Sequence, residues 1–196
     1  ALCTGWTPRY INPLGTRRIL GSYLHGSMAN ALPQAIGAQL AEPGRQVISM
    51  SGDGGLSMLM GELLTLAAYN LPVTVVVFNN STLGMVKLEM LVDGLPDFGV
   101  DVPQANYAQI ATAMGMQGIR VEKPKDLESA FTTALAHQGP SVVEVITDPN
   151  ALSIPPEIKK DQVFGFATAM SRIVLNRGAG EAVSMARSNL RNIPRG

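Results

Sequence analysis

The feature that most constrains the fold is a series of short apolar runs that alternate with helical stretches. The run at residues 73–78, VTVVVF, is the strongest, because β-branched residues occupy both of its faces. A strand that is apolar on both faces is typical of a parallel sheet covered by helices on both sides. Weaker runs at 46–50, 119–121 and 141–147 repeat the pattern. The sequence therefore predicts a doubly wound α/β domain with a mostly parallel sheet.

The remaining expected elements complete this alternation. A further strand is expected first, at residues 18–23. Helices are expected at 27–41, 56–69, 83–91, 107–114 and 126–137, with a loop rich in Gly, Pro and Asp at 93–106. In such sheets a ligand binds outside the carboxyl ends of the strands. The informative positions are therefore those that follow residues 23, 50 and 78.

The character of the chain changes after residue 150. Ile154-Pro155-Pro156 can continue neither a strand nor a helix. A helix with one apolar face is expected at 157–176, ended by Gly178 and Gly180, and a short helix at 181–191. We therefore expect a linker remnant at 1–16, a binding domain at 17–150 and a tail at 151–196. The opening residues do not resemble a natural start, so we infer a piece of a longer protein.

Charge separates this tail from the body of the chain. Residues 1–150 hold 8 Lys and Arg against 12 Asp and Glu, whereas residues 151–196 hold 7 against 3. An acidic body argues against a nucleic-acid partner, and a basic amphipathic tail is compatible with an anionic surface such as a membrane. Only 15% of all residues are charged, against about 25% in a typical soluble domain, which indicates a covered subunit or domain interface. The single cysteine, Cys3, allows no internal disulfide and fits a reducing compartment.

A glycine-rich turn, Ser51-Gly52-Asp53-Gly54-Gly55, leads from the strand at 46–50 into the next helix. Glycines let the backbone turn sharply and approach a ligand, and the N-terminus of a following helix favours a phosphate. Because Asp53 would repel a bare phosphate, it indicates a divalent cation such as Mg²⁺ between the carboxylate and diphosphate oxygens. An ordinary turn is the alternative, and Asp53 alone does not separate the two.

An asparagine pair, Asn79-Asn80, follows the strand at 73–78. Asn carbonyl oxygens suit a hard cation, although an Asn-rich turn is the better explanation of the pair taken alone. Asp53 and Asn80 are 27 residues apart, about the length of one strand–helix–strand crossover. Their strand ends should meet at one edge of the sheet, so the two residues together predict a cation site.

Gly52-Asp53-Gly54, followed after an intervening helix by Asn79-Asn80, resembles the motif of thiamine diphosphate (ThDP) enzymes. The resemblance implies that the side chains of Asp53 and Asn80 bind Mg²⁺, with the backbone carbonyl of Thr82 as a third ligand. It also implies cofactor contacts near the diphosphate from flanking residues, namely Gly52, Gly54, Gly55, Leu83 and Gly84.

The segment His25-Gly26-Ser27-Met28, after the strand expected at 18–23, extends the resemblance. In the decarboxylase and oxidase branch of the family this segment holds the aminopyrimidine ring. The resemblance implies that the Gly26 carbonyl accepts from the 4′-amino group, that Ser27 lies in the same cofactor-binding segment, and that Met28 bends the cofactor. Core packing is the alternative for Met28. His25 is a candidate catalytic residue, with a plain loop position as its alternative.

Residues 5–192 as a whole resemble the C-terminal domain of bacterial pyruvate oxidases, the quinone-dependent pyruvate dehydrogenases. The stretches that carry this likeness are 25–31, 52–61, 118–123 and 154–159. The likeness implies that Glu89 is an active-site glutamate, with a solvated helix residue as the alternative. Met85, a candidate cofactor contact, departs from the family, which places an aromatic residue there.

The resemblance implies oxidative decarboxylation of pyruvate to acetate and CO₂ by the whole protein, with ThDP, Mg²⁺ and FAD as cofactors and a quinone as electron acceptor. In this family the glutamate that activates ThDP and the flavin site belong to separate N-terminal and middle domains. We therefore expect the 196-residue chain alone to be inactive. Acetolactate synthase, or another 2-keto acid carboligase or decarboxylase, is the alternative enzyme. A non-catalytic Mg²⁺/diphosphate-binding or membrane-docking module is the alternative of another class.

The resemblance also implies partners and a cellular location. Low charge and the family together indicate a homo-oligomer, either a dimer or a tetramer. The family's tail responds to lipid, which implies a cytoplasmic protein bound peripherally to the inner face of the cell membrane. A helix that packs against another subunit is the alternative for this tail.

Overall fold

The computed structural model describes residues 2–152 and 160–189, and the chain divides into two compact units. Unit 1 comprises Ala1–Tyr10, Ser81–Val102 and Asp148–Gly196, and unit 2 comprises Ile11–Asn80 and Pro103–Thr147. The expected segments cut the chain differently, because residues 81–102 belong with the C-terminal residues rather than with the sheet. The expected linker at 1–16 contains a helix, α1 (Leu2–Tyr10).

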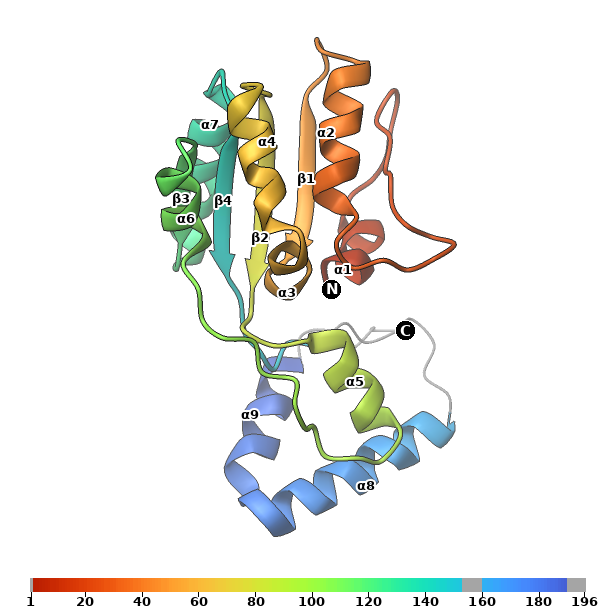
Figure 1. The fold of residues 1–196 in the computed structure, drawn as a ribbon. Helices are drawn as coiled ribbons and strands as arrows, with labels where there is room; N and C mark the ends of the chain where they lie inside the picture. Colours follow the sequence, from red (N-terminus) through yellow and green to blue (C-terminus); the bar gives the residue numbers. More distant parts are fainter. Residues whose placement is uncertain (1, 153–159, 190–196) are drawn as a thin grey trace. The chain divides into compact units, whose positions relative to one another are not determined.

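Unit 2 contains a four-stranded parallel sheet (Figure 1). Its strands are β1 (Val47–Gly52), β2 (Val73–Asn79), β3 (Gln117–Val121) and β4 (Ser141–Ile146), in the order β1-β2-β4-β3. All three pairings are parallel, and Gly52 of β1 is in register with Phe78 of β2. The prediction of a parallel α/β sheet is therefore confirmed, and the two strands that carry the candidate cation ligands are neighbours.

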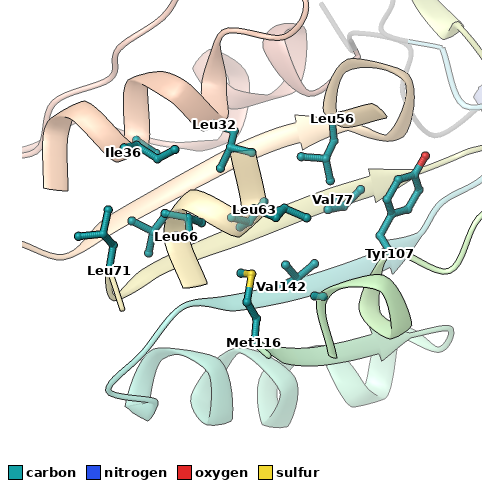
Figure 2. Close-up of a cluster of buried hydrophobic side chains, with 14 residues drawn as sticks. Leu32, Ile36, Leu56, Leu63, Leu66, Leu71, Val77, Tyr107, Met116 and Val142 are labelled. Atoms are coloured by element: carbon teal, nitrogen blue, oxygen red, sulfur yellow. The ribbon is translucent and has the colours of Figure 1, made fainter. Parts of the chain in front are cut away.

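Helices cover both faces of this sheet. They are α2 (Ala31–Ala41), α3 (Asp53–Met58), η1 (Met60–Glu62), α4 (Leu63–Ala68), α6 (Tyr107–Ala113), η2 (Pro124–Asp126) and α7 (Leu127–Ala136). Figure 2 shows the larger core, in which side chains of α2, α4 and α6 pack on alternate residues of β2 such as Val75 and Val77. On the opposite face Val121 and Val143 pack against α7. This alternation explains why the strand at 73–78 had to be apolar on both sides.

Three elements of unit 2 differ from their predictions. The strand expected at 18–23 is wrong, since no strand is present there and β1 is the edge of the sheet. Only Ile19 and Leu20 are strongly apolar in that segment, and Leu20 is 62% exposed, so pairing would bury little apolar surface. The helix expected at 56–69 is divided into α3, η1 and α4, and the helix expected from residue 27 begins at residue 31.

Unit 1 is helical in the part of it that the structure describes. It contains α1, α5 (Gly84–Val92), α8 (Lys160–Arg177) and α9 (Ala179–Asn189). Its apolar core joins α5, α8 and α9 and consists of Leu91, Leu152, Ala169, Ile173 and Met185. The ion pair between Lys87 Nζ and Asp97 Oδ2, 3.4 Å apart, is also buried here, with side chains 8% and 9% exposed.

The two expected tail helices correspond to α8 and α9, and Gly178 separates them. Ile154-Pro155-Pro156, residues 157–159 and residues 190–191 of the expected helices lie outside the described residues. Within the described ranges, no helix combines the length and the hydropathy needed to cross a membrane.

Candidate functional site

Asp53 and Asn80 each lie one residue beyond the end of a strand. Asp53 follows β1 and begins α3, and Asn80 follows β2. Because β1 and β2 are adjacent and parallel, both residues leave the sheet at its carboxyl edge. This is the arrangement that the sequence predicted for the cation site.

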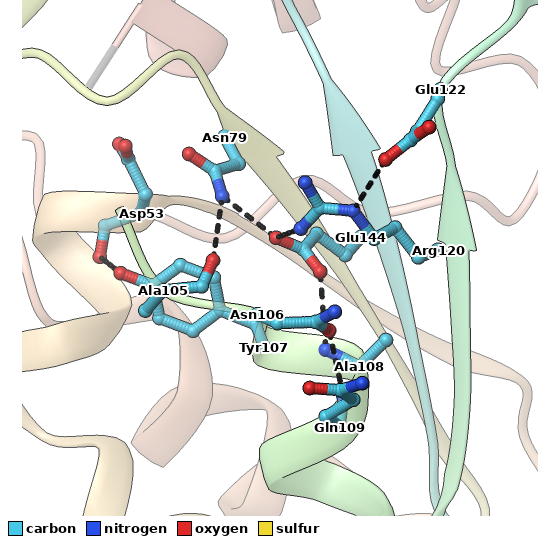
Figure 3. Close-up of polar contacts among 10 residues, drawn as sticks. All are labelled: Asp53, Asn79, Ala105, Asn106, Tyr107, Ala108, Gln109, Arg120, Glu122 and Glu144. Atoms are coloured by element: carbon cyan, nitrogen blue, oxygen red, sulfur yellow. Dashed lines mark hydrogen bonds and ion pairs between the residues drawn. The ribbon is translucent and has the colours of Figure 1, made fainter. Parts of the chain in front are cut away.

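Asp53 is only 3% exposed, and its backbone is held in place by two hydroxyl groups. Its carboxylate oxygen Oδ1 accepts a hydrogen bond of 2.9 Å from the Gly54 N–H. The Ser57 hydroxyl donates to the Asp53 backbone carbonyl at 2.8 Å, and the Tyr107 hydroxyl lies 3.3 Å from the same oxygen. Figure 3 shows the carboxylate directed away from Tyr107. The turn thus fixes the Asp53 backbone through its carbonyl, while the carboxylate extends from the opposite side.

Tyr107 itself has an altered acidity. Its ring is 2% exposed, and its hydroxyl lies 2.7 Å from Ser57 Oγ. Burial raises the pKa of Tyr107 above the ordinary value of 10.0, and the negative charges of Asp53 and Glu144 act in the same direction, although the bond with Ser57 opposes them. Tyr107 is therefore a neutral hydrogen-bonding group over the physiological pH range.

A buried carboxylate, Glu144, lies in the middle of β4 at 0% exposure (Figure 3). Its oxygen Oε1 accepts from Asn79 Nδ2 at 2.7 Å and from an Arg120 guanidinium nitrogen at 2.9 Å. Its oxygen Oε2 accepts from the Ala108 backbone N–H at 3.2 Å. The hydrogen bond of Arg120 with Glu122, together with Glu144, raises the pKa of Arg120 further. Charge and hydrogen bonding are thus matched around Glu144.

The segment from His25 to Met28 lies in a loop before α2, and not at a strand end as expected. Gly26 has a φ of +69°, a left-handed conformation that favours glycine. Met28 is 38% exposed, which does not fit core packing, and its carbonyl oxygen lies 2.8 Å from where a Cβ on Gly55 would be. The structure therefore brings this loop against the Asp53–Gly55 turn, and only a glycine fits there without a shift. His25 and Ser27 are exposed.

The other candidate site residues belong to unit 1. They are Thr82, Leu83, Gly84, Met85 and Glu89. The carbonyl of Thr82 accepts from the Gly84 N–H at 2.9 Å, and a carbonyl oxygen has a second lone pair for a cation. Glu89 and Met85 are exposed on α5. The candidate residues are thus divided between the two units, with Asp53, Asn80 and the Gly26–Met28 loop in unit 2.

The donor set fits a hard divalent cation. A carboxylate at Asp53, an amide oxygen at Asn80 and a backbone carbonyl at Thr82 are all oxygen ligands of the kind that Mg²⁺ prefers. No group of three His, Cys, Asp or Glu side chains suited to a metal occurs among the described residues, which speaks against a zinc-type site there. Helix α3 has only six residues, so glycine geometry is the stronger part of the expected diphosphate contact.

The sequence interpretation missed Glu144, Arg120 and Tyr107. A signal for Glu144 was present, because it is the one charged residue in an otherwise apolar strand, SVVEVI. A charge in a strand buried on both faces requires a partner, and Arg120, in the strand expected at 119–121, was a cation available to it. Nothing in the sequence pattern indicated that Tyr107 would reach the Asp53 carbonyl.

Comparison with known proteins identifies the family of this chain. The family described as "Thiamine pyrophosphate enzyme, C-terminal TPP binding domain" matches residues 2–145. This chain belongs to that family. Thiamine pyrophosphate is another name for ThDP, so the family is named for the cofactor that the motif indicated.

The curated relatives that this TPP-binding domain matches are longer proteins. A thiamine pyrophosphate-containing protein of Bacillus subtilis is 36% identical over 94% of this chain and 32% of its own length. The pyruvate oxidase of Lactiplantibacillus plantarum is 36% identical over 70% of this chain and 23% of its own. Acetolactate synthases are similar to a comparable degree. The chain spans about a third or less of the length of these curated relatives.

A solved structure supports the fold. The ThDP-dependent 4-hydroxybenzoylformate decarboxylase of Rhodococcus jostii superposes with a TM-score of 0.59 at 35% identity. The match covers 63% of this chain and 24% of that enzyme. The parallel sheet with flanking helices is therefore the ThDP-binding fold.

Proposed function

We propose that this TPP-binding domain holds ThDP through Mg²⁺ in a ThDP- and FAD-dependent pyruvate:quinone oxidoreductase. The observation that carries the proposal is that Asp53 and Asn80 lie at the same edge of the sheet. The close approach of the Met28 carbonyl to Gly55 supports it. The pyruvate assignment is supported by the likeness to a pyruvate oxidase. When bound, ThDP supplies the nucleophilic carbon that decarboxylates a 2-keto acid.

The residues of this chain bind and orient. Asp53 and Asn80 would hold the cation, and the resemblance adds the Thr82 carbonyl as a third ligand; bound Mg²⁺ would supply the positive charge that a diphosphate needs. The Met28 carbonyl lies close to Gly55, so the Gly26–Met28 loop and the Asp53–Gly55 turn are near enough to contact the same cofactor. Positioning of this kind lowers a barrier by reducing the entropy cost of reaching the reactive geometry. The resemblance to pyruvate oxidases implies that the residue that activates ThDP and the FAD site belong to N-terminal and middle domains of the whole protein. The chain alone should therefore be inactive.

The cation site is tested by paired aspartate variants. Asp53→Asn should abolish Mg²⁺-dependent ThDP binding, measured by calorimetry, because the amide loses the charge that attracts the cation. Asp126→Asn, the same change at an exposed residue of η2, should leave binding unchanged. Equal binding by both variants would show that Asp53 is not a ligand.

Acetolactate synthase is the second candidate, because one protein described as a member of that class is 35% identical to this chain over 79% of its length. The full-length protein distinguishes the two. Under anaerobic conditions pyruvate should bleach the flavin of an oxidoreductase, and added ubiquinone should restore its colour while acetate accumulates. Formation of acetolactate without net flavin reduction would assign the carboligase function and overturn the first proposal.

We further propose a homo-oligomer and a peripheral membrane role for the tail. Helix α8 exposes Phe164 and Leu175, at 76% and 84%, and residues 151–196 carry four more basic than acidic groups. Phe164→Ser with Leu175→Ser should weaken binding to phosphatidylglycerol vesicles, whereas Leu40→Ser on α2 should not. If the tail packs on a subunit instead, the same pair would lower the mass measured by sedimentation and leave vesicle binding unchanged.

A further inference from the structure

The candidate cation pair in unit 2 depends on two separate turns. Asp53 follows β1 and Asn80 follows the neighbouring strand β2, so the spacing of the two side chains depends on how each turn leaves its strand. Metal affinity depends steeply on that spacing, because Mg²⁺ demands near-ideal octahedral geometry. A group that links both turns would therefore govern affinity without touching the metal.

The turn that bears Asn80 is held through Asn79. The Asn79 backbone carbonyl accepts from the Thr147 N–H at 2.9 Å, and its side-chain amide donates to Glu144 at 2.7 Å and to the Ala105 carbonyl at 3.1 Å. Three contacts from outside β2 thus fix the residue that immediately precedes Asn80. Two of them come from β4 and its continuation, and the third comes from the segment that leads into α6.

The turn that bears Asp53 is held by that same segment. Tyr107, in the first turn of α6, places its hydroxyl 3.3 Å from the Asp53 carbonyl and 2.7 Å from Ser57 Oγ. The next residue, Ala108, donates its N–H to Glu144. Figure 3 shows Glu144 between Asn79 and the start of α6, with Asp53 beyond Tyr107. The first turn of α6 therefore connects both candidate ligands, and Glu144 anchors it.

We propose that Glu144 is a positioning residue for the Mg²⁺ pair, holding Asn79 directly and Asp53 through the first turn of α6. This inference rests on the proposed assignment of Asp53 and Asn80 as metal ligands. Glu144 acts through its two oxygens, of which one orients the Asn79 amide and the other receives the helix N–H. The ion pair with Arg120 retains the negative charge that strengthens both bonds, of which the one from Asn79 is short at 2.7 Å.

A role in stability alone accounts poorly for a carboxylate at this position. Burying an ion pair costs about as much desolvation free energy as the pair regains, and apolar replacements are often neutral or stabilising. An apolar side chain cannot orient an amide and a helix N–H at once. The geometry therefore points to orientation as the contribution of Glu144.

The test measures binding of Mn²⁺ in the presence of ThDP by the full chain, followed by electron paramagnetic resonance of free Mn²⁺. Glu144→Gln should weaken Mn²⁺ binding by roughly 10- to 100-fold, the range typical for groups that orient metal ligands. Glu122→Gln is the matched control, because Glu122 also pairs with Arg120, at 3.0 Å, but is exposed and touches neither turn. Its Mn²⁺ affinity should equal that of the wild type.

A second readout without metal separates positioning from general destabilisation. In amide NMR spectra of the metal-free chain, Glu144→Gln should shift the Asn79 side-chain resonance and the Asp53 and Asn80 backbone resonances, while resonances of α2 stay in place. Glu144→Asp, which keeps the charge, should recover part of the Mn²⁺ affinity. If Glu144→Gln does not fold, Asn79→Ala replaces it and should weaken Mn²⁺ binding in the same range.

The outcomes distinguish this inference from the function on which it rests. Mn²⁺ binding that survives Asp53→Asn, or that the wild-type chain lacks, would overturn the proposed cation site and the role of Glu144 with it. Loss of binding in Asp53→Asn with wild-type affinity in folded Glu144→Gln would overturn the role of Glu144 alone.

Discussion

Replacing Gly118 by alanine tests how closely α6 must lie against β3. A Cβ on Gly118 would lie 1.9 Å from the Ala108 carbonyl oxygen and 2.7 Å from Thr112 Oγ1. Ordinary contact begins at 3.4 Å, so the start of α6 would have to recede by about 1.5 Å. That shift is large enough to break the bond from the Ala108 N–H to Glu144, which is 3.2 Å long.

The expected loss of stability combines two effects. Overpacking costs about 1–3 kcal/mol, and a lost hydrogen bond to a charged group costs about 1.5–3 kcal/mol, so Gly118→Ala should lose about 3 kcal/mol or more. For a chain of this size that corresponds to a fall in Tm of at least about 6 °C by circular dichroism.

The matched control is Gly37→Ala on the exposed side of α2, where an added Cβ meets nothing within 4 Å. This change should raise stability by up to about 1 kcal/mol through helix propensity. A Tm for Gly118→Ala equal to or above that of the wild type would refute the proposed contact between α6 and β3.

Two further predictions concern buried polar groups. In an alkaline absorbance titration, the difference in phenolate signal between the wild type and Tyr107→Phe reports Tyr107, and it should appear only above the ordinary tyrosine pKa of 10.0. Because the folded state favours the neutral phenol, this contribution to stability is complete below pH 10.0 and lost as the pH rises through the folded pKa, so Tyr107→Phe should flatten the alkaline decline in Tm. A difference signal that is complete by pH 10.0 would contradict this. In unit 1, Lys87→Met should cost about 3 kcal/mol in chemical denaturation, because it removes the cation beside the buried Asp97 carboxylate. Adding Asp97→Leu should recover part of that loss, and a double variant no more stable than Lys87→Met would count against the pair.

The strands of the sheet could be predicted because short runs with apolar residues on both faces are typical of buried parallel strands. Val73–Asn79 is apolar on both faces, and a chain buried on both faces has few other solutions. The strand predicted at 18–23 is wrong because this segment has few apolar residues to bury. A local sequence pattern also does not say whether the edge strand of a sheet will pair with a further strand. The division into two units could not be predicted, since it depends on contacts between residues 81–102 and residues beyond 148.

The candidate site could be predicted only as far as sequence spacing fixes it. Asp53 and Asn80 were found because crossover length and strand order place them at one edge. The approach of the Met28 carbonyl to Gly55 was not predicted, since a contact between a loop and a turn leaves no periodic signal. Tyr107 lies 54 residues from Asp53, and only the tertiary structure brings its hydroxyl to that carbonyl.

Glu144 is the residue for which free energy and geometry separate most clearly. Its three hydrogen bonds involve a charged group and contribute about 1.5–3 kcal/mol each. Withdrawing the carboxylate from water offsets part of that gain, while the Arg120 side chain remains 32% exposed and keeps its pair with Glu122. The Ala105 carbonyl keeps one bond to Asn79. Removing the carboxylate altogether would leave the Ala108 N–H without its acceptor and would cost stability, so a loss of folding alone does not identify the role of Glu144. Glu144→Gln keeps an oxygen acceptor beside Asn79 and the first turn of α6, and its metal affinity should therefore fall by more than its stability.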